Sequence, residues 1–391
     1  MKKLAQLTGI VLINIVIIAI LLEILLRVFA PNLPGAVGVA VRWVMTGQPY
    51  QEEWTQAWQQ NIDHYWSLRP DIDNELQYGS PTVSFQLSTV ELWDNAGIGF
   101  RTDPVNYFVD AVVVGDSFGM CFTERADCWV DQLADQTELG VVNLSQPVTG
   151  TTSHLRILRD FGVPLLETNP NPLIIWQFFG NDFNDDYGLA VFRDEIEPID
   201  SDDTGDTDVR QWSALVAVAQ TLITGNFVGV PDSEALFVKP YRATYGDNNV
   251  LQFGGEYELT ALDMSRELNQ IGYVYSQEAF ASANDIARNL NATMLIVIIP
   301  TREEVYREVT APVMGADNVD RLQSARDAML ALCDDLDLTC FDAYHALAQV
   351  AETGEALYYQ DDMHLNPHGN QVLADALTEW IIENYISVTI E

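Results

Sequence analysis

Ser117 is the residue best placed in this chain to act as a nucleophile. It ends a Gly-Asp-Ser sequence that directly follows an apolar run over residues 111–114. Such a run is typical of a strand buried on both faces of a parallel sheet. Open α/β sheets place their chemistry beyond the carboxyl ends of such strands, so the hydroxyl of Ser117 is a candidate for nucleophilic catalysis. Gly-Asp-Ser is also common in ordinary turns, so this reading depends on partners for the serine elsewhere in the chain.

A serine nucleophile requires a base, and His364 is the histidine with the most suitable neighbours. Asp361 and Asp362 precede it by three and two residues. A carboxylate at either distance can reach the ring across a turn and fix its tautomer. The rival is His345, which Asp342 precedes by three residues. Because the residues after His345 look like a packed helical turn, we expect it to be structural.

Acyl transfer also needs hydrogen-bond donors aimed at the developing oxyanion. Asn181 follows the apolar run over residues 173–179, and its side-chain amide could donate there. The loop over residues 143–150 follows another predicted strand and could supply a backbone N–H. Gly-Asn-Asp at 180–182 is by itself an ordinary turn. A functional reading is favoured by the order of the segments. Four segments, one after another along the chain, can each present one component of one acyl-transfer site.

Alternating strand-like and helix-like segments position these groups. The predicted strands are 111–114, 140–144, 173–179, 293–299 and 339–341. The predicted helices are 127–136, 152–161, 277–290, 319–334 and 367–385. Strands that alternate with helices in this way predict an α/β fold with a parallel, doubly wound sheet.

The four segments that contain the candidate catalytic residues resemble the four sequence blocks of the SGNH (GDSL-type) hydrolases. The segments are Gly115-Asp116-Ser117, the glycine-bearing loop after Asn143, Gly180-Asn181-Asp182 and Asp361-x-x-His364. The resemblance covers residues 108–391 apart from an insertion. It implies a flavodoxin-like three-layer fold and hydrolysis of acyl esters without a metal or other cofactor. Residues 95–101 and 300–306 also look like membrane-anchored bacterial members of this group.

The resemblance assigns a role to each candidate. It makes Ser117 the nucleophile and, through its own N–H, an oxyanion donor. It makes Asn181 a second donor and His364 the general base. A third donor comes from the second block, where the family usually has a glycine at the position of Val148. The nearest glycine here is Gly150, so the third donor is the backbone N–H of one of these two residues.

Two aspartates are open as the acid that would orient His364 and stabilise its imidazolium. Asp361 has the family's three-residue spacing to the histidine. Asp362 has a two-residue spacing that resembles a variant in related acyltransferases. We favour Asp361.

The N-terminal residues predict a membrane anchor. Lys2 and Lys3 precede an almost wholly apolar stretch over residues 4–30, long enough for a helix to cross the hydrocarbon layer. The two lysines favour a cytoplasmic N-terminus, which places the rest of the chain outside the cytoplasm. A cleaved signal peptide is the alternative, but the stretch is long and lacks an Ala-x-Ala site. Residues 31–107 are then a juxtamembrane segment, and residues 108–391 form the hydrolase domain, with an insertion near 188–275.

The chain is strongly acidic. Its 19 lysines and arginines against 57 aspartates and glutamates give a formal net charge of −38, which argues against nucleic acid as a partner. The four cysteines form two close pairs, 121/128 and 333/340, whose connectivity the sequence leaves open. Local pairing would suit an oxidising compartment. The cysteine spacing is unlike that of a zinc site.

Three functional hypotheses follow from these observations. The first is a membrane-anchored extracytoplasmic esterase that hydrolyses acyl esters, with O-acetyl groups of a cell-envelope polysaccharide or small esters as substrates. The second is an O-acyltransferase with the same residues, in which a sugar hydroxyl replaces water. The third is a catalytically silent envelope-binding module, since a fold alone does not guarantee activity. The oligomeric state does not follow from the sequence.

Overall fold

The computed structural model describes most of the 391-residue chain. The described residues are 2–29, 37, 41, 44, 56–61, 63–93, 96–199, 213–224 and 239–387. The chain divides into two compact units, Met1–Thr55 with Asp200–Pro240 and Gln56–Ile199 with Tyr241–Glu391. The larger unit therefore begins at Gln56, ahead of the expected domain start at residue 108.

In the smaller unit, Glu23 joins two helices, α1 (Lys2–Val28) and α9 (Ala214–Thr224). Its carboxylate accepts hydrogen bonds from the N–H groups of Ala214 and Leu215, at 3.0 and 2.9 Å, and so caps the first turn of α9. No helix within the described residues is both long enough and apolar enough to cross a membrane. Most side chains in the first half of α1 lie outside the description, and the anchor over residues 4–30 stays a prediction.

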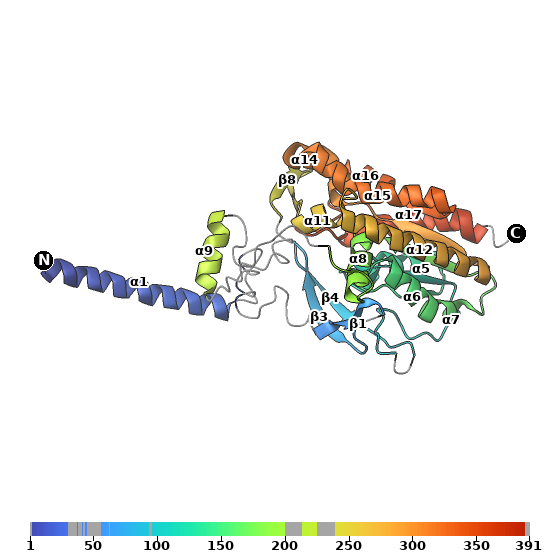
Figure 1. Ribbon diagram of the computed structural model, residues 1–391, viewed down its shortest axis with the longest axis horizontal. Coiled ribbons are helices and arrows are strands. Elements are labelled where there is room, and N and C mark those ends of the chain that lie inside the picture. Colours follow the sequence, from blue (N-terminus) through green and yellow to red (C-terminus); the bar gives the residue numbers. More distant parts are fainter. Residues whose placement is uncertain are drawn as a thin grey trace. The chain divides into compact units, whose positions relative to one another are not determined.

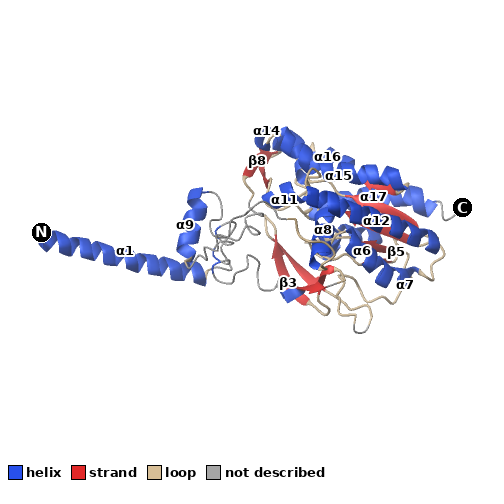
Figure 2. Ribbon diagram, in the orientation of Figure 1, coloured by secondary structure: helices blue, strands red, loops and turns tan. Residues whose placement is uncertain are grey.

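The core of the larger unit is a five-stranded parallel sheet (Figure 2). Its strands are β5 (Ala111–Val114), β6 (Val141–Asn143), β7 (Leu173–Phe178), β10 (Thr293–Ile298) and β11 (Thr339–Asp342). They lie in the order β11-β10-β7-β5-β6. Numbered along the chain this is 2-1-3-4-5, the flavodoxin-like order. The predicted parallel α/β sheet is confirmed, with each strand within one residue of its predicted bounds.

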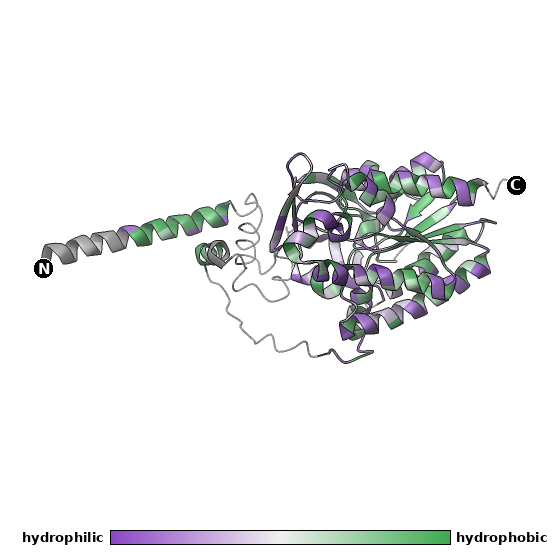
Figure 3. Ribbon diagram, turned by 90° about the horizontal axis from the view of Figure 1, so that it is seen from above, coloured by the Kyte–Doolittle hydropathy of each residue, from purple (hydrophilic) through white to green (hydrophobic). Residues whose placement is uncertain are grey.

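Helices flank the sheet (Figure 1), and their contacts with one another divide them into two groups. One group is α6 (Thr151–Ile157), α8 (Asp182–Phe192) and α12 (Glu267–Leu290), and the other is α5 (Trp129–Thr137), α16 (Tyr344–Ala351) and α17 (Pro367–Ile381). Further helices of this unit are α4 (Ser117–Met120), α11 (Glu256–Ala261), α13 (Arg302–Val305) and α15 (Ala316–Leu336). Figure 3 shows the sheet as a hydrophobic layer between these helices, in agreement with strands such as β5 and β7 whose residues are all buried.

Within the described residues, three antiparallel hairpins complete the larger unit. They are β1/β2 (Trp58–Asn61 and Tyr65–Leu68), β3/β4 (Asp73–Tyr78 and Val83–Ser88) and β8/β9 (Tyr241–Tyr245 and Asn249–Phe253). The first two come from the expected juxtamembrane segment and the third from the predicted insertion. Gln146 ties this N-terminal part to the sheet, because its side chain accepts from the N–H of Leu68 (2.8 Å) and donates to the carbonyl of Gly99 (3.1 Å).

Candidate active site

Ser117 lies at the carboxyl end of β5 and opens the short helix α4. Asp116 caps this helix, since its carboxylate accepts from the N–H of Phe118 at 2.8 Å. Gln177 reaches the turn from β7, where its Oε1 accepts from the N–H groups of Asp116 (2.9 Å) and Gly119 (3.1 Å). A side chain of the neighbouring strand therefore fixes the backbone of this nucleophile turn, residues 115–119.

His364 lies within hydrogen-bond distance of Ser117, although 247 positions separate the two residues. The distance from Ser117 Oγ to His364 Nε2 is 2.7 Å. On the other side of the ring, His364 Nδ1 lies 2.5 Å from Oδ1 of Asp362. When Ser117 donates its proton to Nε2, Nδ1 carries the ring hydrogen and donates it to Asp362. These contacts match the arrangement of a nucleophile, a general base and an orienting acid.

The carboxylate beside the ring belongs to Asp362 and not to Asp361, the residue that the family spacing favours. Oδ1 of Asp362 also accepts from the backbone N–H of His364 at 2.9 Å. The side chain thus closes a turn over its own backbone, a conformation that aspartate adopts readily. This turn places a carboxylate two residues before the histidine directly at Nδ1. The preference for Asp361 is therefore wrong for the contact with Nδ1. The residue that makes this contact is Asp362, which has the two-residue spacing.

Two hairpins from outside the sheet hold residues 360–364, which we call the acid–base turn. The N–H of Gln360 donates to the carbonyl of Ser80, beyond the end of β3, at 2.8 Å. The carbonyl of Gln360 accepts from the N–H of Gln252, in β9, at 2.7 Å. Backbone hydrogen bonds on both sides therefore fix the start of this turn.

Arg302 holds the same turn from a third direction. Its Nη1 donates to the carbonyl oxygen of Asp362 at 2.6 Å. The side chain is completely buried, and its charge is paired with Glu258 (3.4 Å) and Glu303 (3.3 Å). A buried charge is tolerated when it is paired and hydrogen-bonded in this way. Arg302 belongs to the segment 300–306 that the sequence singles out, and its contact with Asp362 gives that segment a position in the site.

Arg101 has the corresponding place on the nucleophile side. It is 2% exposed, and its guanidinium donates to the carbonyls of Met120 (2.9 Å), Cys121 (2.8 Å) and Thr123 (2.5 Å). Burial lowers the pKa of Arg101 to about 10. The disulfide Cys121–Cys128 closes the same segment. The chain directly after the nucleophile helix is therefore fixed by one buried cation and one covalent bond.

Asn181 follows β7 at the same edge of the sheet, but its amide already has acceptors. Its Nδ2 lies 3.1 Å from Oδ2 of Asp185 and 3.3 Å from the hydroxyl of Tyr257, in α11. These two contacts use both hydrogens of the amide. For Asn181 to act as an oxyanion donor, a substrate oxygen must replace one of these acceptors, and the hydroxyl of Tyr257 is the more distant of the two.

The two candidates for the third donor differ in conformation. Val148 has a φ of +54°, in the left-handed region that glycine adopts readily and β-branched residues rarely. Gly150 has an extended backbone and is the N-cap residue of α6. A Cβ atom at Gly150 would lie 2.5 Å from the carbonyl oxygen of Asp182. A glycine at this position therefore allows the two backbone segments to pack closely. Val148 therefore has a backbone conformation typical of glycine, and the identity of the third donor stays a prediction.

The buried carboxyl of Asp116, in the nucleophile turn, interacts electrostatically with those of Asp182 and Asp185, and Asp182 and Asp185 in turn interact with Asp186. Burial raises the pKa of Asp116 and of Asp186 to about 6. Burial and the neighbouring carboxylates raise the pKa of Asp182 and of Asp185 well above the usual range. Their neutral forms are thus favoured in the folded protein at mildly acidic pH. Within the described residues, no group of three or more His, Cys, Asp or Glu side chains is arranged to hold a metal ion.

The rival histidine is not in this site. His345 is exposed on α16. The carboxylate proposed to accompany it, that of Asp342, instead accepts from Nη1 of Arg326 at 2.8 Å. The expected helical turn at His345 is present, whereas a structural role for its exposed side chain stays a prediction.

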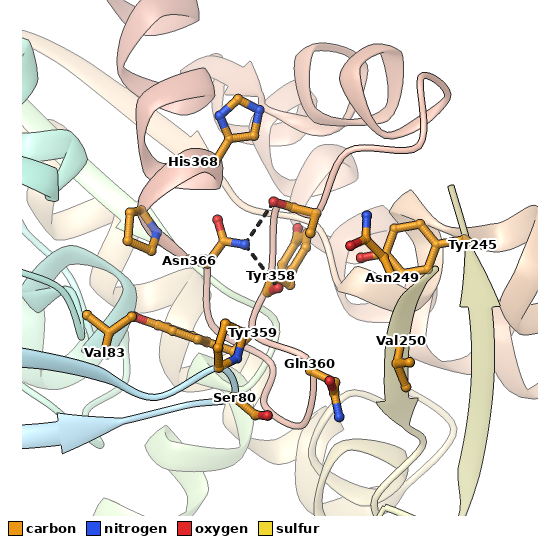
Figure 4. Close-up of a pocket in the computed structure, with 13 residues that line it drawn as sticks. Ser80, Val83, Tyr245, Asn249, Val250, Tyr358, Tyr359, Gln360, Asn366 and His368 are labelled. Atoms are coloured by element: carbon orange, nitrogen blue, oxygen red, sulfur yellow. Dashed lines mark hydrogen bonds between the residues drawn. The ribbon is translucent and has the colours of Figure 1, made fainter. Parts of the chain in front are cut away.

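A cavity of about 360 Å³ adjoins the acid–base turn (Figure 4). Its walls come from hairpin β3/β4, from hairpin β8/β9 and from residues 356–368. Asn366 lines the cavity, and its side-chain amide donates to the carbonyls of Ala356 (2.8 Å) and Tyr358 (3.2 Å), as the dashed lines show. The described residues that line it include neither Ser117 nor His364, so the cavity shares only the turn with the site.

Sequence reasoning missed Gln177 and Tyr78, whose side chains contact the site. Gln177 has a signal in the sequence, because it is a polar residue inside the otherwise apolar strand β7. Tyr78, at the end of β3, has none. Its hydroxyl lies 2.9 Å from Nδ1 of His364 across 286 positions of sequence, in a segment without a motif.

Residues 266–387 match the family described as the SGNH hydrolase-like domain of acetyltransferase AlgX. This part of the chain is similar to the SGNH hydrolase-like proteins. The matched part contains the acid–base turn, while Ser117 precedes it. No curated protein matches the chain.

Solved structures of low identity are also similar to the chain. A member of the lipolytic G-D-S-L family from Veillonella parvula is 9% identical, covers 71% of this chain and 97% of its own, and has a TM-score of 0.37. A lipase/acylhydrolase from Enterococcus faecalis is 11% identical, with coverage of 70% and 95% and a TM-score of 0.35. The acetyl xylan esterase AlAXEase is 10% identical, with coverage of 69% and 98% and a TM-score of 0.34. At these TM-scores the similarities add no argument about function.

Proposed function

We propose that this chain is a serine-dependent enzyme that cleaves acyl esters. The observation that carries the proposal is the hydrogen-bonded chain Ser117–His364–Asp362 at the carboxyl edge of the sheet. Nε2 of His364 takes the proton of Ser117 as Oγ bonds to the acyl carbonyl carbon. Asp362 accepts from Nδ1 and stabilises the imidazolium that forms.

The oxyanion of the tetrahedral intermediate then needs donors at the same edge. The N–H groups of Ser117 and Val148, or Gly150 in its place, and the amide of Asn181 are the proposed donors. The intermediate expels the alcohol, which takes the proton from His364 and leaves the acyl group on Ser117. A water molecule that His364 deprotonates attacks the acyl-serine, releases the acid and restores the hydroxyl. The scheme requires no metal or other cofactor.

The acyl group proposed is acetyl, carried by a cell-envelope polysaccharide or a small alcohol. The family match supports a second candidate, an O-acyltransferase, because the matched family is described as an acetyltransferase. In that reaction a sugar hydroxyl replaces water in the second step, and the same residues act. A catalytically silent module has less support, since the hydroxyl and the imidazole are in contact as catalysis requires.

The proposed location is outside the cytoplasm, on an N-terminal anchor over residues 4–30. Lys2 and Lys3 before the apolar stretch support this orientation. The disulfides Cys121–Cys128 and Cys333–Cys340 also support it, because disulfides persist mainly in oxidising compartments.

An acyl-donor assay tests the proposal and separates its two forms. The purified full chain is incubated with p-nitrophenyl acetate, first alone and then with non-acetylated cell-envelope polysaccharide. Free acetate without transfer identifies an esterase, and acetylated polysaccharide identifies a transferase. Both products should disappear in Ser117→Ala. Product formation that Ser117→Ala leaves unchanged, or no product with any acyl ester, contradicts the proposal.

A further inference from the structure

His364 has a second partner at the ring nitrogen that faces Asp362. The hydroxyl oxygen of Tyr78 lies 2.9 Å from Nδ1, and Oδ1 of Asp362 lies 2.5 Å from the same atom. Two oxygens thus compete for one nitrogen. Tyr78 belongs to hairpin β3/β4, so a segment before the α/β sheet reaches the centre of the site.

The protonation of the ring decides what the tyrosine can do. In the reactive tautomer Nε2 is free to accept from Ser117, so the single ring hydrogen is on Nδ1. Tyr78 cannot donate to a nitrogen that carries hydrogen, so its oxygen acts there as an acceptor. The hydrogen on Nδ1 is then shared between a carboxylate and a phenol oxygen.

Aromatic packing fixes Tyr78 in this position. Its ring stacks on Phe122, with centroids 4.1 Å apart and planes 13° from parallel. Phe122 in turn meets the ring of His364 edge-on at 4.6 Å, and Phe118 lies 4.6 Å from the same ring. The imidazole is therefore enclosed by aromatic rings as well as hydrogen-bonded, and little freedom remains for it to rotate.

The backbone after Tyr78 is also adapted to this contact. Gly79 has a φ of +70°, and the ring of Tyr359 occupies the space of a side chain there, 2.1 Å from an ideal Cβ position. The next residue, Ser80, accepts from the N–H of Gln360 at 2.8 Å. The end of β3 is thus bonded to the acid–base turn itself, and Tyr78 and His364 are placed by one connected piece of structure.

We infer that Tyr78 is a positioning residue, whose hydroxyl oxygen is a second acceptor for the Nδ1 hydrogen of His364 and holds the reactive tautomer together with Asp362. The inference rests on the proposed function. It makes the site a group of four side chains, in which Tyr78 partly replaces Asp362 when the carboxylate is missing.

A double-mutant cycle on p-nitrophenyl acetate hydrolysis tests this inference. Tyr78→Phe keeps the ring stack and removes only the oxygen, so kcat should fall about 3-fold with KM unchanged. Asp362→Ala should lower kcat about 10²-fold, less than the roughly 10⁴-fold loss that follows when asparagine replaces the acid of a catalytic triad. In the Asp362→Ala background, Tyr78→Phe should cost a further factor of about 10².

Tyr359→Phe is the matched control, because Tyr359 lies in the same aromatic cluster but donates its hydroxyl to the carbonyl of Phe122 (2.6 Å). It should change kcat by the same factor with and without Asp362. If Tyr78→Phe also costs the same factor in both backgrounds, Tyr78 is merely structural and the inference is overturned. If Ser117→Ala is as active as the unmodified chain, the proposed function itself fails, so the two failures are distinct.

Discussion

The nucleophile turn and the acid–base turn are held in place by different parts of the molecule. Ser117 directly follows a central strand, and the side chain of Gln177 fixes its turn from the next strand of the same sheet. His364 follows no strand of the sheet, and its turn is bonded to hairpin β3/β4, to β9 and to Arg302 of α13. The sheet therefore supplies the nucleophile, whereas segments outside it supply the geometry of the base.

The two turns also differ in how their buried charges are balanced. Around the nucleophile turn, burial raises the pKa of Asp116, Asp182, Asp185 and Asp186. Behind the acid–base turn, the buried carboxylates Glu258 and Glu303 are paired with Arg302. The stability of the nucleophile turn should therefore depend on the protonation of the buried aspartates. The stability of the acid–base turn should depend on the ion pairs of Arg302. Changes at the two turns should therefore have distinguishable consequences.

The largest effect is expected where the two neighbouring aspartates are compared. Asp362→Asn should lower kcat about 10⁴-fold, because an amide can donate to Nδ1 and hold the wrong tautomer of His364. Asp361→Asn, a matched change one residue away, should stay within about 3-fold. The measurement is kcat for hydrolysis of p-nitrophenyl acetate. A larger loss in Asp361→Asn than in Asp362→Asn would show that the aspartate with the family spacing is the acid after all.

This pair also shows how far the sequence predicts the site. The strand before Ser117 and the order of the four blocks are local patterns, and both the sheet and the contact between Ser117 and His364 follow the prediction. The choice between Asp361 and Asp362 depends on a turn in which a carboxylate bonds to its own backbone, and spacing alone does not reveal it. Tyr78 depends on a hairpin far away in sequence, and no pattern around it indicates a contact with a histidine.

Arg302 and Arg101, which hold the acid–base turn and the segment after the nucleophile helix, should differ in their effect on catalysis. Arg302→Lys keeps a charge but loses the planar group that bonds Asp362 and two glutamates at once, so kcat should fall about 10- to 30-fold. Arg101→Lys should cost only about 3-fold, because Gln177 and the strand still fix the nucleophile turn. Thermal melts of both variants separate loss of folding from loss of positioning. An equal or greater loss of kcat in Arg101→Lys would refute the contrast between the turns.

The two disulfides form a second matched pair. Cys121–Cys128 and Cys333–Cys340 each span seven positions, so replacing either pair by alanine should lower the free energy of unfolding by a similar amount, about 2–3 kcal/mol. Cys121–Cys128 closes the segment after the nucleophile helix, whereas Cys333–Cys340 joins α15 to β11. Only loss of the first should also lower kcat, by about 3- to 10-fold. Equal kcat in the two double variants would show that the first bond does not position Ser117.

The smallest effect is expected from pH. The pKa values of Asp116 and Asp186 are raised by burial from 3.8 to about 6, so the folded state binds protons that the unfolded chain has released. These two groups therefore contribute most to stability below about pH 4. Their contribution is lost as pH rises through 6. Between pH 5 and pH 8 these two groups alone should lower the free energy of unfolding by about 1–3 kcal/mol.

Denaturant unfolding at both pH values measures this change, with added salt to screen surface charge. Asp182→Asn provides the control, because the pKa of this buried carboxyl is raised well above its usual range and the amide cannot ionise. The variant should lose less stability than the unmodified chain between pH 5 and pH 8. A free energy of unfolding that rises over this interval would mean that the buried acids are ionised without cost.

Covalent labelling with a fluorophosphonate tests most directly the central claim, that His364 activates Ser117. Intact-mass and peptide analysis of the labelled full chain should show a single adduct, on Ser117. The adduct should be absent in Ser117→Ala, and His364→Ala should slow its formation by about 10³-fold or more. An adduct on another residue, or a labelling rate that His364→Ala leaves unchanged, would contradict the account.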